Sequence, residues 1–340
     1  MRMRIVQMAT MIGLGAMLAF GARAPQAASS HIILCGSGGD KAYQEKFAAW
    51  GARLRTTLAD QLGQPAERIV LLTEAADSAT TPARVSDLET IRALLKETAD
   101  ALAPDDDLFV YLIGHGSHWR GVSRFHVPGP DLTADDLAAW LEGVRARRVV
   151  VVNAASSGAG FLNALSRPGR VICTATRSVD ERNAPEFMEG FVKALEDRSA
   201  DQNRDERISV LEACRQAAAL TDAFYTGRGL LATEHALLDD NGDRLGTRLI
   251  EAAQTEPPPD APTTGTAESL DGAAAADCFL QDFSFGPDVP RELVDRYRSI
   301  LHRIEELKAG KAAMESEAYY AALEALLVEA ARTHREIRKK

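Results

Sequence analysis

Four consecutive valines, at positions 149–152, limit the folds open to this chain more than any other stretch. A strand with one face in water alternates apolar and polar residues. An unbroken apolar run is typical of a strand buried on both faces, as in a parallel sheet covered by helices. The run ends in the small residues of NAASSG (153–158). Open α/β sheets bind ligands at the carboxyl ends of their strands, so small residues there leave room for a ligand.

Apolar runs alternate with helical patterns through residues 31–250. The runs lie at 31–34, 69–72, 108–113, 149–152 and 171–174. Between them, apolar residues recur every three or four positions, which predicts amphipathic helices at 43–62, 86–102, 133–144, 185–195 and 208–224. Ser86 with Glu89 predicts a capping box, and Thr133 predicts a helix N-cap. The alternation predicts an α/β fold, a doubly wound and mostly parallel sheet with helices on both faces.

Composition divides the chain into four parts. Residues 1–28 have a basic start, a short apolar run and a small-residue end, a pattern that favours a cleaved signal peptide over an uncleaved anchor. Residues 31–250 form the α/β domain. Residues 251–289, with three prolines at 257–259, are expected to be a flexible linker. Residues 290–340 are charged and helical, and a break near Gly310 predicts a C-terminal α-helical hairpin.

The acidic composition bears on partners and location. The 340 residues carry a formal net charge of −10, which argues against a nucleic-acid partner, because phosphate binding needs a basic face. With the signal removed, we expect no stable membrane insertion and an exported protein, periplasmic or extracellular. Such a protein could pair its cysteines, but buried free thiols are the simpler interpretation of Cys173 and Cys214.

Two strand ends carry residues that could perform chemistry. The run at 108–113 is followed by Gly114, His115 and Gly116, and the valine run is followed by NAASSG. Because the carboxyl ends of parallel strands meet at one edge of a sheet, we expect both segments at the same edge. A histidine after one strand and a nucleophile after the next is the arrangement of a catalytic dyad.

In these residues the chain resembles the legumain family of caspase-fold cysteine peptidases. Those enzymes place His-Gly after one strand and a Glu-Ala-Cys-x-Ser-Gly type motif after the next, where this chain has GHGS (114–117) and NAASSG. The resemblance covers about residues 32–246 and extends to CGSGGD (35–40), TATRS (174–178), ADQNRDERISVLEA (200–213) and EHALLDDNGD (234–243).

The resemblance implies a caspase-like fold in which His115 is the general base and the backbone N–H of Gly116 helps to hold an oxyanion. It also implies that Ala155 occupies the position of the nucleophile. Because alanine has no thiol, acyl transfer in the manner of that family is excluded at this position.

Three interpretations follow, none of which requires a cofactor. In the first, an exported peptidase homologue binds a peptide or protein without cutting it. In the second, the chain is an active hydrolase that uses Ser156 or Cys35 with His115, although adjacent side chains leave the backbone in different directions and Cys35 is typical of a buried structural thiol. In the third, it is a structural or interaction protein whose C-terminal helices contact a partner or a second copy.

Further residues have weaker assignments. Asp40, Arg177 and Ser178 lie in loops where the resembling family builds its specificity pocket, although surface ion pairing is the commoner role of such residues. The sequence DDNGD at 239–243 predicts a tight turn.

One acidic segment has the spacing of a calcium loop that leads into a helix. Its candidate oxygen ligands are Asp201, Asn203, Asp205 and Glu212. Glu206 stands at the sixth position, where glycine is expected. A plain acidic turn that caps a helix is therefore the alternative to a calcium site.

Overall fold

The computed structural model describes residues 28–75, 83–250, 271–282, 289–311 and 314–339. The predicted signal peptide, apart from its last residue, lies outside the described residues. So does the part of the expected linker at 251–270.

The described elements follow one another in the order that the alternating sequence pattern predicts for most of the chain. They are β1 (Ser29–Cys35), α1 (Lys41–Thr56) with a π-helical continuation at Thr57–Gln61, a 3-10 turn at Ala66–Arg68, β2 (Ile69–Thr73), β3 (Arg84–Val85), α2 (Leu88–Ala101), β4 (Asp107–Gly114), β5 (Gly116–Trp119), β6 (Val122–Phe125), β7 (Leu132–Thr133), α3 (Ala134–Leu141), β8 (Arg148–Ala155), α4 (Ala159–Leu165), β9 (Arg170–Thr174), α5 (Phe187–Glu196), β10 (Arg207–Ser209), α6 (Val210–Thr226), β11 (Leu237–Asp239), β12 (Thr247–Arg248), α7 (Ala273–Ala276), β13 (Phe279–Asp282), α8 (Arg291–Ala309) and α9 (Ser316–Ile337).

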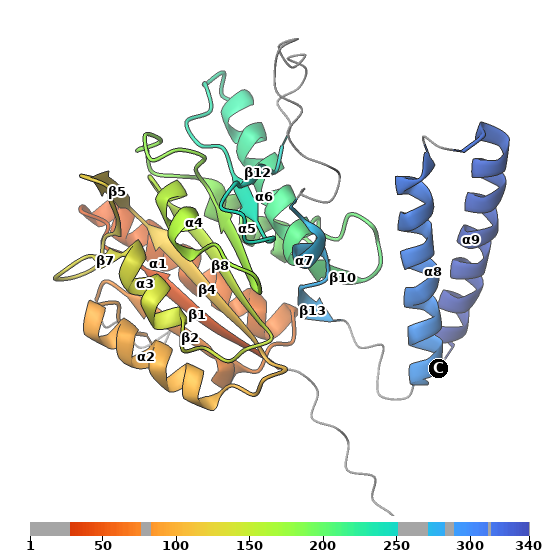
Figure 1. The fold of residues 1–340 in the computed structure, drawn as a ribbon, viewed down its shortest axis with the longest axis horizontal. Helices are drawn as coiled ribbons and strands as arrows, with labels where there is room; N and C mark the ends of the chain where they lie inside the picture. Colours follow the sequence, from red (N-terminus) through yellow and green to blue (C-terminus); the bar gives the residue numbers. More distant parts are fainter. Residues whose placement is uncertain (1–27, 76–82, 251–270, 283–288, 312–313, 340) are drawn as a thin grey trace, which may run out of the picture.

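Within the described residues, eight strands form one sheet in the order β12-β11-β9-β8-β4-β1-β2-β3 (Figure 1). The strands from β9 to β3 pair in parallel, whereas β11 and β12 run antiparallel at one edge. The valine run lies in β8, and none of its four side chains is more than 5% exposed. The predicted class is therefore confirmed: an α/β protein with a large, mostly parallel sheet flanked by helices.

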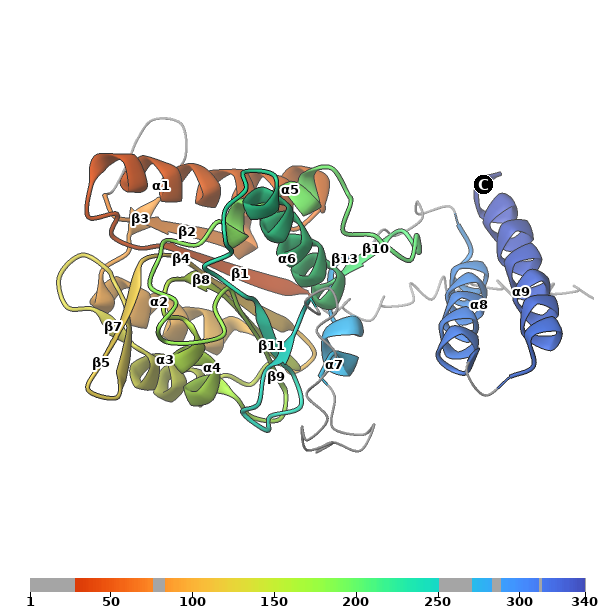
Figure 2. The same cartoon turned by 90° about the horizontal axis from the view of Figure 1, so that it is seen from above.

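Helices cover both faces of this sheet, as Figure 2 shows. Successive residues of β4 point to opposite faces. Phe109, Tyr111 and Ile113 pack in the core beneath α1, α5 and α6. Leu108, Val110 and Leu112 pack in the core beneath α2, α3 and α4. This two-sided burial is why the strands carry unbroken apolar runs.

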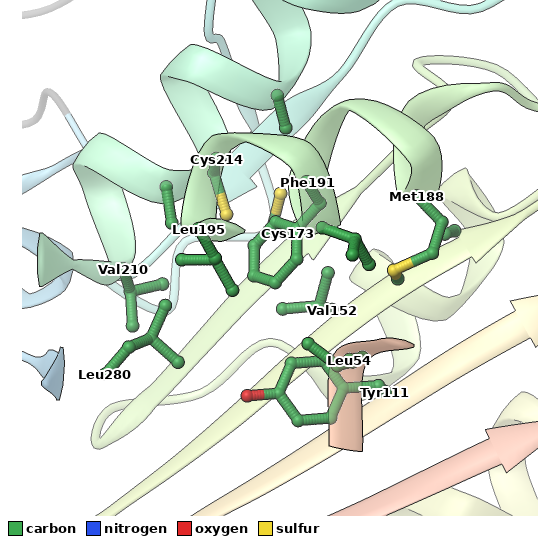
Figure 3. Close-up of a cluster of buried hydrophobic side chains, with 14 of the residues drawn as sticks. Leu54, Tyr111, Val152, Cys173, Met188, Phe191, Leu195, Val210, Cys214 and Leu280 are labelled. Carbon is green, nitrogen blue, oxygen red and sulfur yellow. The ribbon is translucent and has the colours of Figure 1, made fainter. Parts of the chain in front are cut away.

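The core beneath α1, α5 and α6 contains most of the buried sulfur-containing side chains of the domain. In Figure 3 the side chains of Cys173 from β9 and Cys214 from α6 lie close to Phe191 and Leu195 of α5, with Tyr111 and Val152 of the sheet below them. Both cysteines are buried and free, as predicted, and so are Cys35 and Cys278.

The N-termini of α2 and α3 test the two helix caps that the sequence predicts. Thr133 caps α3, and its side chain forms a capping box with Asp136, so that prediction is confirmed. The predicted Ser86 capping box is wrong, because α2 begins one residue later with Asp87 as its N-cap. Ser86 is buried instead, and its Oγ donates a hydrogen bond of 2.7 Å to the backbone oxygen of Cys35.

Two sequence assignments fail where a short strand pairs with a distant segment. Ile208 was expected to begin a helix, but it lies in β10 and α6 begins at Val210. Residues 271–282 were expected to belong to the flexible linker at 251–289, but they form α7 and β13. β13 pairs antiparallel with β10, and Cys278 and Leu280 are buried in the domain core. Burial of these side chains stabilises the segment 271–282, whose own sequence contains little that predicts a helix or strand.

The described residues end with two long helices, α8 and α9, which pack against each other through an apolar cluster of their own (Figure 1). Nε2 of His334 in α9 lies 2.8 Å from the Glu206 carboxylate of the α/β domain. Among the described helices, we find none with the length and apolar character needed to cross a bilayer.

Candidate functional site

The register of β4 and β8 brings the predicted site segments to one edge of the sheet. Gly114 is the partner of Ala155 in the parallel ladder, so His115 and Ser156 each follow the last paired residue of neighbouring strands. This is the shared edge that the sequence predicts for the ends of parallel strands.

His115 is half-buried against α1. Its ring makes edge contacts with the rings of Tyr43 and Phe47, with centroids 4.7 and 5.0 Å away. Burial lowers the pKa of His115 below its usual value, and the nearby His126 lowers it further. A hydrogen bond with the backbone of Gly38 and the charge of Asp40 oppose this shift. Near neutral pH the ring is therefore mostly uncharged, as a general base or a hydrogen-bond acceptor requires.

Ser156 is tied to the residue that follows His115. The Ser156 Oγ accepts the backbone N–H of Gly116 at 3.0 Å and donates to the backbone oxygen of the same residue at 3.2 Å. A hydroxyl has a single proton, so Ser156 donates to Gly116 and not to His115. The N–H group expected to hold an oxyanion is thus already occupied by a side chain of the protein.

Gly116 itself is required by this contact. A Cβ on Gly116 would lie 2.4 Å from the backbone oxygen of Ser156 and 2.8 Å from that of Arg124. No side chain fits there without moving backbone, so the close approach of β5 to the end of β8 depends on this glycine.

Ala155 is 1% exposed and packs in the core beneath α2, α3 and α4, whereas the His115 ring packs on α1 at the opposite face. The methyl group at the nucleophile position is therefore a core contact. Cys35 is also buried, and its thiol donates to the backbone oxygen of Phe47 at 3.2 Å. Burial raises the pKa of Cys35 to about 12, which leaves almost no thiolate at neutral pH.

The turn from β8 into α4 contains residues whose roles the sequence did not reveal. Ser157 has a φ of 54°, a left-handed conformation that is unusual for serine. It is 2% exposed, and its Oγ has no hydrogen-bond partner among the described residues. Its N–H donates to the backbone oxygen of Glu181 at 2.8 Å, and the next N–H, of Gly158, donates to Thr176 Oγ at 2.8 Å. The loop after β9 therefore holds this turn in place.

Glu181 joins that loop to the start of β11. Its carboxylate lies 2.5 Å from Nδ1 of His235 and 3.4 Å from Nε of Arg177, and it accepts the N–H groups of both residues. The short segments TATRS and EHALL contain Arg177 and His235, and Glu181 follows the first of them, but only the folded sheet shows that the three residues meet.

The three residues assigned to a specificity pocket have local structural contacts. Asp40 accepts the N–H of Tyr43 at 2.9 Å and is the N-cap of α1. Arg177 is paired with Glu181, and Ser178 Oγ accepts the N–H of Asp180 at 3.1 Å. All three lie in loops at the carboxyl edge of the sheet, and their part in specificity stays a prediction.

A cavity of about 120 Å³ lies beside this loop, at the edge formed by β9 and β11. Its lining includes Phe187, Thr221, Glu234 and His235. Glu234 is 5% exposed, and its carboxylate accepts the N–H groups of Glu186 and Phe187 at the start of α5 and the hydroxyl of Tyr225. Burial raises the pKa of Glu234 to about 7. The predicted set of site residues did not include it.

The predicted calcium loop is closed by protein contacts. Asp201 accepts the N–H groups of Asp205 and Glu206, and Asp205 pairs with Arg207 at 3.0 Å. Glu212 forms a capping box with Ser209 at the start of α6, and Asn203 Oδ1 accepts the N–H of Asp205. Glu206 has a φ of 65°, the conformation for which glycine is expected at this position.

Among the described residues, Asp201, Asp205 and Glu212 do not form a group whose ligand atoms all lie within 4.8 Å of one another. Asp239, Asp243 and Asp271 do. The last three also accept backbone N–H groups of the turn at 239–247, so this acidic cluster stabilises the turn. Calcium binding at the predicted loop stays a prediction.

The fold and site together define an α/β protein with a mostly parallel sheet and a polar carboxyl edge centred on His115, Gly116 and Ser156. Comparisons with known proteins do not narrow this class. No family model matches the chain, and no curated protein matches it.

Proposed function

We propose that this chain is an exported, legumain-like homologue of the caspase-fold cysteine peptidases that binds peptide or protein segments without cleaving them. In this proposal the C-terminal helices α8 and α9 form a hairpin module beside the binding domain. The motifs GHGS and NAASSG, at neighbouring strand ends of a mostly parallel sheet, support the family assignment.

The observation that carries the proposal is the pair of hydrogen bonds between Ser156 and Gly116. Hydrolysis of a peptide needs an activated nucleophile and a free N–H group for the developing oxyanion. Here Ala155 offers no nucleophile, and Ser156 uses its only proton on Gly116 while it occupies the N–H group. The exposed part of His115, beside Tyr43, remains available at this edge to contact a bound peptide.

The first experiment separates binding from cleavage. The purified protein is incubated with a library of internally quenched fluorescent peptides and, separately, with the same peptides immobilised on an array. We expect binding of a subset without cleavage, and weaker binding by His115→Ala. His302→Ala, at an exposed histidine of α8, is the matched control and should bind as the wild type does. Cleavage that disappears in His115→Ala would contradict the proposal.

A second experiment asks whether a thiol at position 155 is enough for cleavage. The side chain of residue 155 packs in the core on the face opposite the His115 ring, and Ser156 occupies the Gly116 N–H group. We therefore expect neither Ala155→Cys nor the double variant Ala155→Cys with Ser156→Ala to cleave peptides. Cleavage by Ala155→Cys alone would show that neither the packing of residue 155 nor the Ser156 contact keeps the site inactive.

A further inference from the structure

Helix α9 uses one face to pack against α8. Leu326, Ala330 and Ile337 of α9 meet Tyr297, Ile300 and Ile304 of α8 in the shared apolar cluster, and all six are buried. In Figures 1 and 2 the two helices lie side by side, with the other side of α9 turned away from α8.

The outer face of α9 is also apolar. Tyr320, Leu327 and Val328 are 56%, 51% and 41% exposed, and they rank among the most exposed large apolar side chains of the described residues. With Ala331 and with Leu323, which also packs against the α8–α9 cluster, they line a surface groove, in which Glu324 is the one charged residue. The spacing of these positions by three, four and seven places them on one helix face. We call this set the outer stripe.

The charges beside the outer stripe change sign along the helix. Glu317 and Glu324 lie on its N-terminal half, and Arg332 and Arg335 lie on its C-terminal half; all four are exposed. Glu317, Glu324 and Arg335 are separated by seven and eleven residues, which are close to whole numbers of helical turns, so they follow the same side of the stripe.

This charge pattern is complementary to that of a second α9 helix that runs in the opposite direction. If a second copy of α9 lies antiparallel on the stripe, Glu317 of one copy meets Arg335 of the other, and the same contact repeats on the far side of the twofold axis. The axis then passes beside Leu327, which follows the midpoint between these two residues. A parallel arrangement would place Glu317 against Glu317 and Arg335 against Arg335.

We propose that two copies of this chain associate through the outer stripe of α9, with the two α9 helices antiparallel and the two α8–α9 pairs forming a four-helix bundle. The apolar stripe supplies the buried contact, and the reversed charges fix the direction. This interface is independent of the site at His115, so neither proposal depends on the other.

The test is sedimentation equilibrium of the purified protein over a range of concentrations and salt. We expect a reversible dimer that weakens with salt. Leu327→Glu places two carboxylates beside the axis, and we expect it to raise the dissociation constant at least about tenfold. Glu336→Arg, on an exposed position away from the stripe, is the matched control and should dimerise like the wild type. Circular dichroism checks that each variant keeps its helices.

Charge reversal tests the direction. Glu317→Arg and Arg335→Glu should each weaken the dimer about fivefold, because each removes two attractive contacts and creates two repulsive ones, and the combined variant should regain wild-type affinity. Leu327→Cys should form a disulfide-linked dimer on mild oxidation, since the four native cysteines are buried. A wild-type monomer at every concentration, or a dimer that Leu327→Glu leaves unchanged, would overturn the proposal. A combined reversal that dimerises no better than the single variants would overturn the antiparallel arrangement.

Discussion

Glu234 is expected to make the stability of this protein depend on pH. Its carboxyl group is buried at the start of α5, and burial raises its pKa from 4.5 to about 7. Because the folded pKa lies above the unfolded value, the folded state binds the proton more tightly. The free energy of unfolding is therefore highest below about pH 4.5. The free energy of unfolding falls as the pH rises from about 4.5 to about 7, and at higher pH the ionisation of Glu234 changes it no further.

The size of this effect follows from the shift. A shift from 4.5 to about 7, at about 1.4 kcal/mol per pH unit, corresponds to about 3 kcal/mol. Glu234→Gln should remove the fall, since glutamine does not ionise. Glutamine resembles the protonated form of Glu234, because both side chains carry a hydrogen-bond donor close to the N–H groups of Glu186 and Phe187.

The assay is urea denaturation of wild type and Glu234→Gln at several pH values from 4.5 to 8.5, followed by far-UV circular dichroism. The difference in unfolding free energy between the two proteins should change by about 3 kcal/mol across this range, in favour of the variant at high pH. Glu67→Gln, at an exposed glutamate before β2, controls for the loss of a surface charge. A difference that stays constant with pH would refute the reasoning.

Three further changes test the described packing. Gly116→Ala should lower stability by about 2 kcal/mol or more, measured by thermal unfolding, because its Cβ meets two backbone oxygens. Ser156→Ala should cost about 2 kcal/mol in urea denaturation, since it leaves the N–H and C=O groups of Gly116 without their partner. Burial lowers the pKa of His31 to about 3, so stability should fall as the pH drops from about 6.5 toward 3. His31→Phe, which keeps the stacking on Phe109, should lose less stability in acid, and an equal loss would refute this assignment.

The central sheet could be predicted because its signal is local. The runs at 108–113 and 149–152, which lie in β4 and β8, contain no charged residue and do not alternate apolar with polar side chains, so they predict burial on both faces. The shared edge of His115 and Ala155 followed from the geometry of parallel strands alone.

The features that the sequence did not predict share a different cause. β13 has four residues, and it is stabilised by pairing with β10, some seventy positions earlier in the chain. Its alanine-rich surroundings have the composition of a linker, and no local pattern reveals the partner. The same holds for Glu181 and His235, which meet only because β11 pairs with β9. Such contacts depend on the assembled fold and not on the residues around them.

The Ser156 contact also constrains how the proposed site binds its ligand. A peptide carbonyl that reached the Gly116 N–H group would have to displace the Ser156 hydroxyl, which would exchange one hydrogen bond for another at little net gain. Binding free energy must therefore come from side-chain contacts, such as those that the exposed part of His115 and the adjoining Tyr43 can offer. Transition-state stabilisation depends on the N–H contact, whereas ground-state binding does not. The Ser156 contact therefore weighs against catalysis at this edge far more than against binding.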